Sequence, residues 1–202
     1  MTREEIRLKG ESFENKIFGE EDSSPNLGPY SAPDYLDFPR SLQQIIERNW
    51  SRLEYSITKG EGYFHNPIRP TMGKTHDLWS AVKNYLPNRG VRPPLPLNLY
   101  VSRGRNSLDY WHGVDLFFWW NGEYVTVDLA TKNKPRENHT KERRRVLKSD
   151  FIFIPEDLEH NRLLFFGKQV ANLLVERENH SKGVEELNFS LLVEKLLYAG
   201  LR

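Results

Sequence analysis

Two aspartates interrupt the two most apolar stretches of this chain. Asp115 lies in the run HGVDLFFWW at positions 112–120, and Asp128 lies in EYVTVDLA at positions 123–130. A carboxylate within a buried strand is costly unless it is paired, hydrogen-bonded or bound to a cation. These two residues are therefore the first candidates for chemistry in the sequence.

The spacing of the two aspartates places them on neighbouring strands of one hairpin. Asn-Gly at 121–122 separates the two runs, and this dipeptide is the strongest short-range signal for a two-residue hairpin turn. Such a turn pairs Trp120 with Glu123. The same register predicts that Asp115 and Asp128 lie directly opposite each other on one face, with Cβ atoms about 4.5–5.5 Å apart.

Two carboxylates at that distance repel each other unless a divalent cation lies between them. Oxygen-only ligands favour Mg²⁺, Mn²⁺ or Ca²⁺ over zinc, and the absence of Cys excludes thiolate sites and disulfides. The alternative is that both aspartates point to solvent, or that each pairs with an arginine. Against this alternative, the neighbours on that face are not uniformly polar: they are Phe117, Trp119, Thr126 and Ala130.

Hydrophobic periodicity and turn residues predict the elements that position the two aspartates. The first helix is expected to begin with Ser41 as its N-cap. The order of elements indicates an α+β fold, with a mixed central sheet of about four strands in an α-β-β-β-α-β order and helices on its flanks. The expected helices span 41–57, 75–86, 134–148, 158–177 and 184–199, and the expected strands span 97–103, 112–120, 123–130 and 151–154.

This arrangement resembles the PD-(D/E)xK nuclease superfamily, which includes restriction endonucleases and Holliday-junction resolvases. The resemblance covers about residues 41–155 and rests on the order of elements, on Gly-Val-Asp at 113–115, and on the second acid 13 positions later. It implies that Asp115 is the metal-binding aspartate and that Asp128 is the acid of the (D/E)xK element. It also implies a restriction-endonuclease-like sheet.

The chain departs from the family pattern at the motif lysine. Ala130 stands two residues after Asp128, where the family has Lys, and the nearest lysine is Lys132. The basic role falls either to Lys132 or to the following helix, where the candidates are Lys134, Lys141, Arg143, Arg144 and Arg145. The family often adds a glutamate from the first helix, and Glu47 and Glu54 are the candidates here, with ordinary solvated positions as the alternative.

Basic residues are concentrated directly after the second aspartate. Residues 132–148 carry a net charge of +6, although the whole chain carries only +1, because the segments 1–40 and 149–202 are acidic. Such a segment can lie along a phosphate backbone, although a solvated helix face is the common fate of a charge run. The expected nucleic-acid contacts are Arg103, Arg105, Lys134, Lys141, Arg143, Arg144, Arg145 and Lys148.

These observations predict a metal-dependent endonuclease that hydrolyses phosphodiester bonds in DNA with Mg²⁺ or Mn²⁺, with branched, mobile-element or viral DNA as candidate substrates and RNA as an open alternative. A second hypothesis is a nuclease-like fold that has lost catalysis and serves as a nucleic-acid-binding or assembly module. A third is a domain whose basic helix binds an acidic protein. A homodimer through the C-terminal helices is also considered.

The predicted organisation has three parts. Residues 1–40 are expected to form an irregular N-terminal arm, 41–155 the nuclease-like core, and 156–202 a helical extension that packs on the core or on a partner. The charged N-terminus lacks the apolar region of a secretory signal, and no apolar run reaches the roughly 18 residues of a membrane helix. A cytoplasmic, intracellular protein without membrane contact is therefore expected.

Overall fold

A computed structural model describes residues 3–19, 37–59, 65–71, 73–87, 96–102, 108, 112–130 and 149–181. The described elements follow one another as helices, then strands, then a final helix. They are α1 (Arg3–Phe18), α2 (Phe38–Lys59), α3 (Thr75–Lys83), β1 (Asn98–Val101), β2 (Leu116–Trp120), β3 (Glu123–Leu129), β4 (Phe151–Phe153), the 3₁₀ turn η3 (Pro155–Leu158) and α5 (His160–Ser181).

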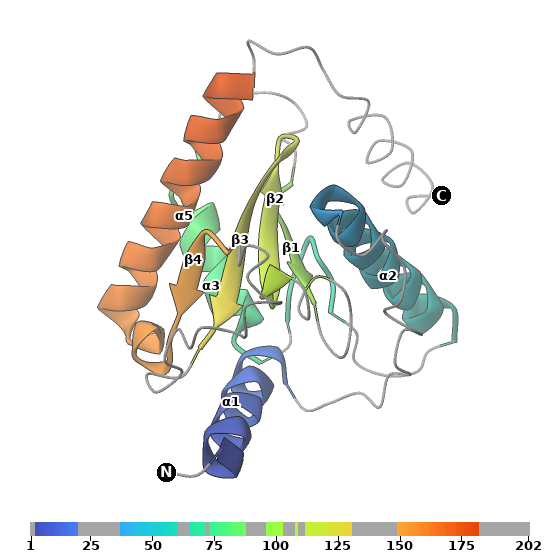
Figure 1. Cartoon of the computed structure of the whole chain (residues 1–202). Helices are drawn as coiled ribbons and strands as arrows, with labels where there is room; N and C mark the ends of the chain where they lie inside the picture. Colours follow the sequence, from blue (N-terminus) through green and yellow to red (C-terminus); the bar gives the residue numbers. More distant parts are fainter. Residues whose placement is uncertain are drawn as a thin grey trace.

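The four strands form one open mixed sheet in the order β1-β2-β3-β4 (Figure 1). β2 pairs antiparallel with both β1 and β3, and β4 is parallel to β3. An α+β fold with a mixed four-stranded sheet is therefore confirmed. Each observed strand lies within its predicted range, because the apolar runs and turn residues mark these strands clearly.

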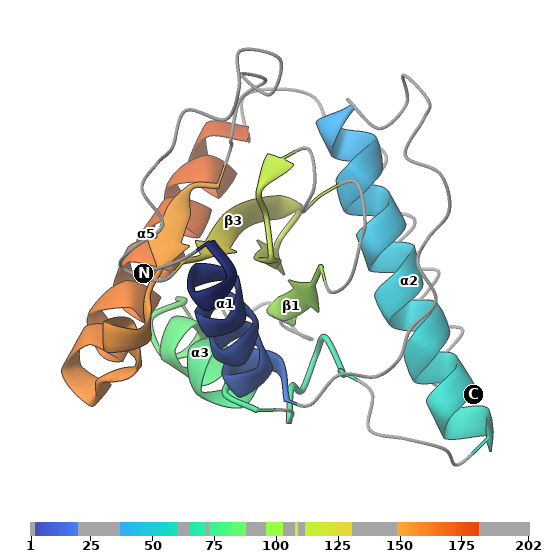
Figure 2. The same ribbon diagram turned by 60° about the horizontal axis from the view of Figure 1, so that its bottom comes forward.

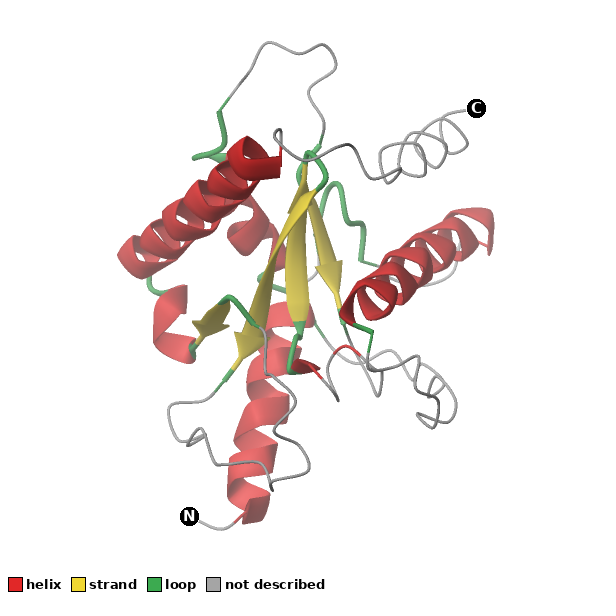
Figure 3. Ribbon diagram, turned by 45° about the horizontal axis from the view of Figure 1, so that its top comes forward, coloured by secondary structure: helices red, strands yellow, loops and turns green. Residues whose placement is uncertain are grey.

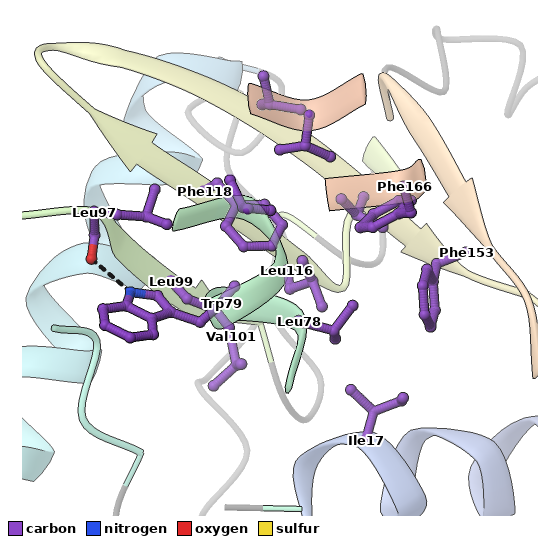
Figure 4. Close-up of a cluster of buried hydrophobic side chains, with 14 of the residues drawn as sticks. Ile17, Leu78, Trp79, Leu97, Leu99, Val101, Leu116, Phe118, Phe153 and Phe166 are labelled. Carbon is purple, nitrogen blue, oxygen red and sulfur yellow. Dashed lines mark hydrogen bonds between the residues drawn. The ribbon is translucent and has the colours of Figure 1, made fainter. Parts of the chain in front are cut away.

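Helices cover both faces of this sheet. On one face α3 and α5 pack against alternate residues of the strands, among them Leu99, Leu116 and Phe118, which are fully buried (Figure 4). Trp79 of α3 also donates its indole N–H to the carbonyl of Leu97 over 2.8 Å. Figure 2 shows α2 apart from α1, α3 and α5, which lie together on the other side of the sheet.

The second face is covered by α2, whose apolar stripe packs on the intervening strand residues. Leu42 and Ile45 are buried there against Tyr100 and Phe117. The helix begins earlier than predicted, at Phe38, so Ser41 is an internal residue rather than the N-cap. Asp37 precedes the first turn instead, and its carboxylate accepts the N–H of Arg40 at 3.5 Å. Ser and Asp are both favoured N-cap residues, so the residue types alone did not distinguish Ser41 from Asp37 as the residue before the helix.

The outer edge of β1 is closed by backbone and side-chain hydrogen bonds. The N–H of Leu99 donates to the carbonyl of Pro67 over 2.9 Å, and the ring of His65 contacts the carbonyl of Leu99. Asn49 of α2 donates to the carbonyl of Val101 over 3.1 Å and accepts the N–H of the same residue over 3.4 Å. These bonds fix α2 to the sheet and satisfy backbone groups of an edge strand that would otherwise attract another chain.

The N-terminal part of the chain differs from the prediction. Residues 3–18 form α1 rather than an irregular arm, and Ile17 is fully buried in the core. The N–H of Lys74 donates to the carbonyl of Ile17 over 2.8 Å. Gly73 has a φ of 52°, and a Cβ at this position would lie 2.3 Å from the same carbonyl oxygen, so only glycine permits this close approach.

The helix predicted at 158–177 is present in the structure as α5. α5 is one continuous helix that packs against α3 and the sheet, which makes residues 160–181 part of the same core. Figure 3 shows this helix beside the sheet. The predicted helices at 134–148 and 184–199 lie outside the described residues. No helix in the described part of the chain is long and apolar enough to cross a membrane.

Candidate metal site at the base of the hairpin

The β2–β3 hairpin has the predicted turn and register. Asn121 and Gly122 have φ angles of 51° and 86°, the left-handed conformation that a two-residue hairpin turn requires at both positions. Trp120 pairs with Glu123, as the sequence predicted. The turn therefore sets which residues of β2 and β3 face each other down to the open end of the hairpin.

The register changes at Asp115, just before β2 begins. The last regular pair is Leu116 with Val127, but the N–H of Asp115 also donates to the carbonyl of Val127, over 3.0 Å. Two residues of one strand thus oppose one residue of the other, which is the arrangement of a β-bulge. The predicted direct opposition of Asp115 and Asp128 is therefore wrong in detail. The prediction extended the regular pairing to Asp115, whereas that pairing ends at Leu116 and Val127.

The bulge directs the Asp115 carboxylate towards the end of β3. One of its oxygens accepts the backbone N–H of Leu129 over 2.6 Å, and the residue is only 6% exposed. The carbonyl of Asp115 accepts the N–H of Ser102, which follows β1, over 2.7 Å. Asp115 therefore joins the ends of β1, β2 and β3, and its carboxylate is bound next to the backbone of Asp128.

Asp128 is half-buried on the penultimate residue of β3. It pairs with Ile152 of β4 in the parallel part of the sheet. The side chains of Thr126 and Tyr124, which share its strand parity, belong to the face covered by α2, where Tyr124 packs with the residues of that layer. The two acids thus belong to neighbouring positions at one end of the sheet, although they are not a cross-strand pair.

The chemistry of these two residues fits a hard divalent cation. A carboxylate has about four acceptor positions, and the N–H of Leu129 uses one of those on Asp115. Within the described ranges no group of three or more His, Cys, Asp or Glu residues is arranged to hold a metal. Mg²⁺ commonly takes one or two carboxylates from a protein and completes its shell with water and phosphate oxygens.

The two glutamates that the sequence offered as additional ligands lie on α2 and do not join this site. Glu47 and Glu54 are exposed on α2, and Glu47 accepts a hydrogen bond from Gln43 over 2.8 Å. The inward face of the helix presents Asn49 instead, which is bound to β1. Glu47 and Glu54 therefore occupy ordinary solvent-exposed positions, which was the alternative expected from the sequence.

The position of the family's motif lysine is described in the structure, whereas most of the predicted basic contacts are not. Ala130 is buried, and its N–H donates to the carbonyl of Phe153 over 2.9 Å, so this position serves the β3–β4 pairing. The remaining predicted contacts lie outside the described residues; they are Arg103, Arg105, Lys132, Lys134, Lys141, Arg143, Arg144, Arg145 and Lys148.

A second polar cluster, which the sequence did not reveal, lies beside β3 between Tyr124 and Thr126. Asp150 and Arg177 of α5 form a bidentate ion pair, with N–O distances of 2.6 and 3.0 Å. The same carboxylate accepts the N–H and the hydroxyl of Thr126 over 2.9 and 3.0 Å. The guanidinium also donates to the carbonyl of Tyr124. Asp150 directly precedes an apolar strand, but nothing in the sequence links it to a residue 27 positions later.

Aromatic rings of the α2 layer pack beside the two polar regions. Phe38 packs edge-on against the ring of His112 at 4.9 Å and lies 5.9 Å from the ring of Tyr124. His112 is buried just before the Asp115 bulge. Burial raises the pKa of Tyr124, and the nearby Arg177 guanidinium opposes that rise.

The buried Tyr100 lies under the middle of α2. Burial raises its pKa to about 12, and the hydrogen bond from the Trp50 indole, at 3.2 Å, acts in the opposite direction. Its hydroxyl therefore stays protonated at neutral pH and serves the packing of α2 on β1.

No match for this chain was found among protein-family models, curated proteins or solved structures.

Proposed function

We propose that this chain is a metal-dependent nuclease that hydrolyses phosphodiester bonds in DNA, with Asp115 and Asp128 as the ligands of Mg²⁺ or Mn²⁺. The observation that carries the proposal is the Asp115 carboxylate, which is buried and bound only 2.6 Å from the N–H of Leu129, beside Asp128. The donor is a neutral backbone group, so this bond orients the carboxylate without cancelling its charge.

The connectivity of the sheet supports the same proposal. An antiparallel β1–β2–β3 meander followed by β4 parallel to β3 is compatible with the order of elements that the PD-(D/E)xK resemblance implies. In that resemblance the first acid lies near the start of the second strand and the second acid lies in the third strand. Asp115 immediately precedes β2, and Asp128 lies in β3.

The proposed reaction adds water to the phosphorus atom and breaks the bond from phosphorus to the leaving oxygen. A divalent cation held by Asp115 and Asp128 would supply Lewis acidity and lower the pKa of the attacking water, whose proton passes to solvent while the leaving oxygen takes one up. Asp115 is held rigidly by three strands and orients its carboxylate, while Asp128 supplies the second negative ligand. A basic side chain must stabilise the charge that develops on the phosphate, and Lys132 or the basic residues after it are the candidates.

A second candidate function is a nuclease-like module that binds nucleic acid or supports an assembly without cutting. The observation that favours it is Ala130, which is buried where the family pattern has its lysine. In this case the two carboxylates still bind a cation, but no cation-bound phosphate is cleaved.

The deciding experiment compares cleavage of plasmid and branched DNA by the wild type, Asp115→Ala and Asp128→Ala in Mg²⁺, in Mn²⁺ and in EDTA. The nuclease proposal expects metal-dependent cleavage by the wild type and its loss in both variants, with DNA binding retained. Absence of cleavage in every metal, with DNA binding intact, would eliminate the nuclease and favour the binding module. Absence of both cleavage and binding would eliminate both functions.

A further inference from the structure

The outward side of α5 carries a stripe of residues that is complementary to itself. The stripe consists of five residues spaced three or four apart along the helix: Arg162, Phe165, Gln169, Leu173 and Glu176. We call them the α5 stripe. Phe165 and Leu173 each lie four residues from Gln169, and Arg162 and Glu176 each lie seven residues from it. The stripe therefore has an apolar residue on each side of its centre, a base at one end and an acid at the other.

The α5 stripe lies on the flank of the helix next to the β4 edge of the sheet. Within the stripe's length, the inward-facing Phe166 packs on Phe151 and Phe153 of β4, with ring centroids 5.8 and 4.7 Å away. Near the other end of the helix, Arg177 binds Asp150 just before β4. No described strand pairs with the outer side of β4, and Figure 1 shows α5 beside this open edge.

The α5 stripe is open to solvent in the described structure. Phe165 is 63% exposed, and Arg162, Gln169 and Glu176 are also exposed. Leu173 is half-buried, because its inner side packs against the core. Exposed apolar surface with a polar rim is typical of an interaction site.

The two charged ends of the stripe are weakly engaged within the described chain. Arg162 lies 3.6 Å from Glu159, but both side chains are more than half exposed, and a pair of this kind contributes little. Glu176 forms no ion pair with any described residue. Both ends can therefore meet a charge of opposite sign on another molecule.

We propose that the α5 stripe is a homodimer contact, at which α5 packs antiparallel against the same helix of a second copy of this chain. A two-fold axis near Gln169 makes the contact isologous, as is usual for a dimer of identical chains. Each Arg162 then lies opposite Glu176 of the partner subunit, and each Phe165 lies opposite Leu173 of the partner subunit. This inference is independent of the proposed nuclease activity.

The charge pattern favours a second copy in the antiparallel arrangement. Parallel packing would oppose Arg162 to Arg162 and Glu176 to Glu176, whereas antiparallel packing makes both end pairs attractive. The two contacts between Phe165 and Leu173 bury the exposed ring on both sides of the axis. A copy bound on this flank also lies next to β4, where it shields an open edge strand from other chains.

The size of the stripe sets the expected strength of the dimer. From Arg162 to Glu176 the stripe covers about 21 Å of helix at 1.5 Å per residue. One helix pair of this length buries less surface than a standard stable interface. The dimer is therefore expected to be in equilibrium with the monomer, and its fraction should rise with protein concentration.

Sedimentation velocity of the full chain, without DNA and over a wide range of concentration, measures this equilibrium. Arg162→Glu opposes carboxylates at both ends of the contact, and Glu176→Arg opposes guanidinium groups there. Each variant is expected to weaken dimerisation by at least about 10-fold, or about 1.4 kcal/mol. A wild type that stays monomeric at every concentration overturns the proposal.

Mixing the two reversed variants tests the antiparallel register. In the heterodimer of Arg162→Glu with Glu176→Arg, both end pairs are attractive again, so the mixture should dimerise about as well as the wild type although neither variant does so alone. The double variant Arg162→Glu/Glu176→Arg should recover dimerisation for the same reason. If the wild type dimerises but the mixture and the double variant do not, the contact lies elsewhere and the α5 stripe is overturned.

The matched control is Arg69→Glu, which reverses an exposed arginine near the opposite edge of the sheet, two residues after the Pro67 carbonyl that binds β1. It should dimerise like the wild type, and an equal loss in Arg69→Glu and Arg162→Glu would reduce the effect to net charge and overturn the stripe. Urea unfolding at low concentration, where the monomer predominates, shows whether each variant folds. If a reversed variant does not fold, Phe165→Ala replaces it, with Ile57→Ala of the exposed Ile57 on α2 as its control. Only Phe165→Ala should weaken the dimer, and equal dimerisation by these two variants overturns the proposal.

Discussion

The two ends of the β2–β3 hairpin hold their carboxylates in opposite ways. Towards the turn end, Glu178 of α5 accepts the side-chain amide of Asn121 over 3.0 Å, and Arg177 donates to the carbonyl of Tyr124 and binds Asp150 beside Thr126. At the open end, Asp115 accepts a backbone N–H. The turn end thus fastens α5 to the sheet through side chains, while the open end fixes one carboxylate through the strands.

The difference separates structural acids from candidate metal ligands. An arginine that binds both oxygens of a carboxylate neutralises it and occupies its coordinating positions. A backbone N–H carries no formal charge, so the bond from Leu129 fixes the direction of the Asp115 carboxylate without neutralising it. Burial alone therefore does not identify a functional acid; the chemical nature of the donor that holds it is more informative.

The largest effect that this comparison predicts is on cleavage by Asp115→Asn. The asparagine oxygen can still accept the N–H of Leu129, so the fold is retained, but the negative ligand is lost. Because a bound cation supplies several kcal/mol of transition-state stabilisation, cleavage in Mg²⁺ should fall by at least about 100-fold. Initial rates of plasmid nicking measure the loss.

Two additional readouts make this prediction specific. The unfolding midpoint of Asp115→Asn should stay close to that of the wild type, and calorimetric titration should show weaker Mn²⁺ binding. If Asp115→Asn cleaves DNA at the wild-type rate, the charge of this residue has no part in the reaction. The distinction between the two ends of the hairpin would then have no functional meaning.

The next effect is on stability and concerns the turn end. Asp150→Ala leaves the guanidinium of Arg177 and the N–H of Thr126 without their carboxylate acceptor. The ion pair is partly exposed, with side-chain exposures of 31% and 19%, so a loss of about 2 kcal/mol is expected, less than for a fully buried pair. Urea unfolding measures the loss from the shift of the midpoint at constant slope.

A surface ion pair at the start of α5 is the control for Asp150→Ala. Arg162 and Glu159 are 3.6 Å apart, and both are more than half exposed. Arg162→Ala should therefore cost less than about 0.5 kcal/mol. Equal losses in the two variants would show that the Asp150–Arg177 pair is not a specific anchor of α5.

The strands and the hairpin were predictable from sequence because their signals are local. The apolar runs at 116–120 and 151–153 and the Asn-Gly turn depend on residues next to each other in the chain. The same locality predicted the buried stripe of α2, in which Leu42 and Ile45 recur at helical spacing.

Features that depend on distant contacts were not predictable. α1 has few apolar residues, and its Phe13 is buried in a core that includes Phe153, 140 positions later, with ring centroids 6.3 Å apart. The bulge at Asp115 leaves no mark in the apolar pattern, yet it changes which residues face each other. The Asp150–Arg177 pair is likewise a product of the tertiary fold.

The smallest effect tests the backbone at the two ends of the hairpin with a matched pair of glycines. Gly122 in the turn and Gly113 before Asp115 have φ angles of 86° and 60°. Alanine in this conformation costs about 1 kcal/mol. A Cβ at Gly122 meets nothing within 4 Å, so Gly122→Ala should lower stability by that amount alone and leave cleavage unchanged.

Gly113→Ala carries the same backbone cost but acts two residues before the carboxylate that the bulge directs. A relaxed backbone there shifts Asp115 relative to Leu129, so cleavage should fall several-fold for a comparable loss of stability. Unfolding and nicking rates are measured on both variants. Equal cleavage by the two would mean that the approach to the bulge does not position Asp115, whereas a loss confined to Gly113→Ala would place catalytic geometry at the open end of the hairpin.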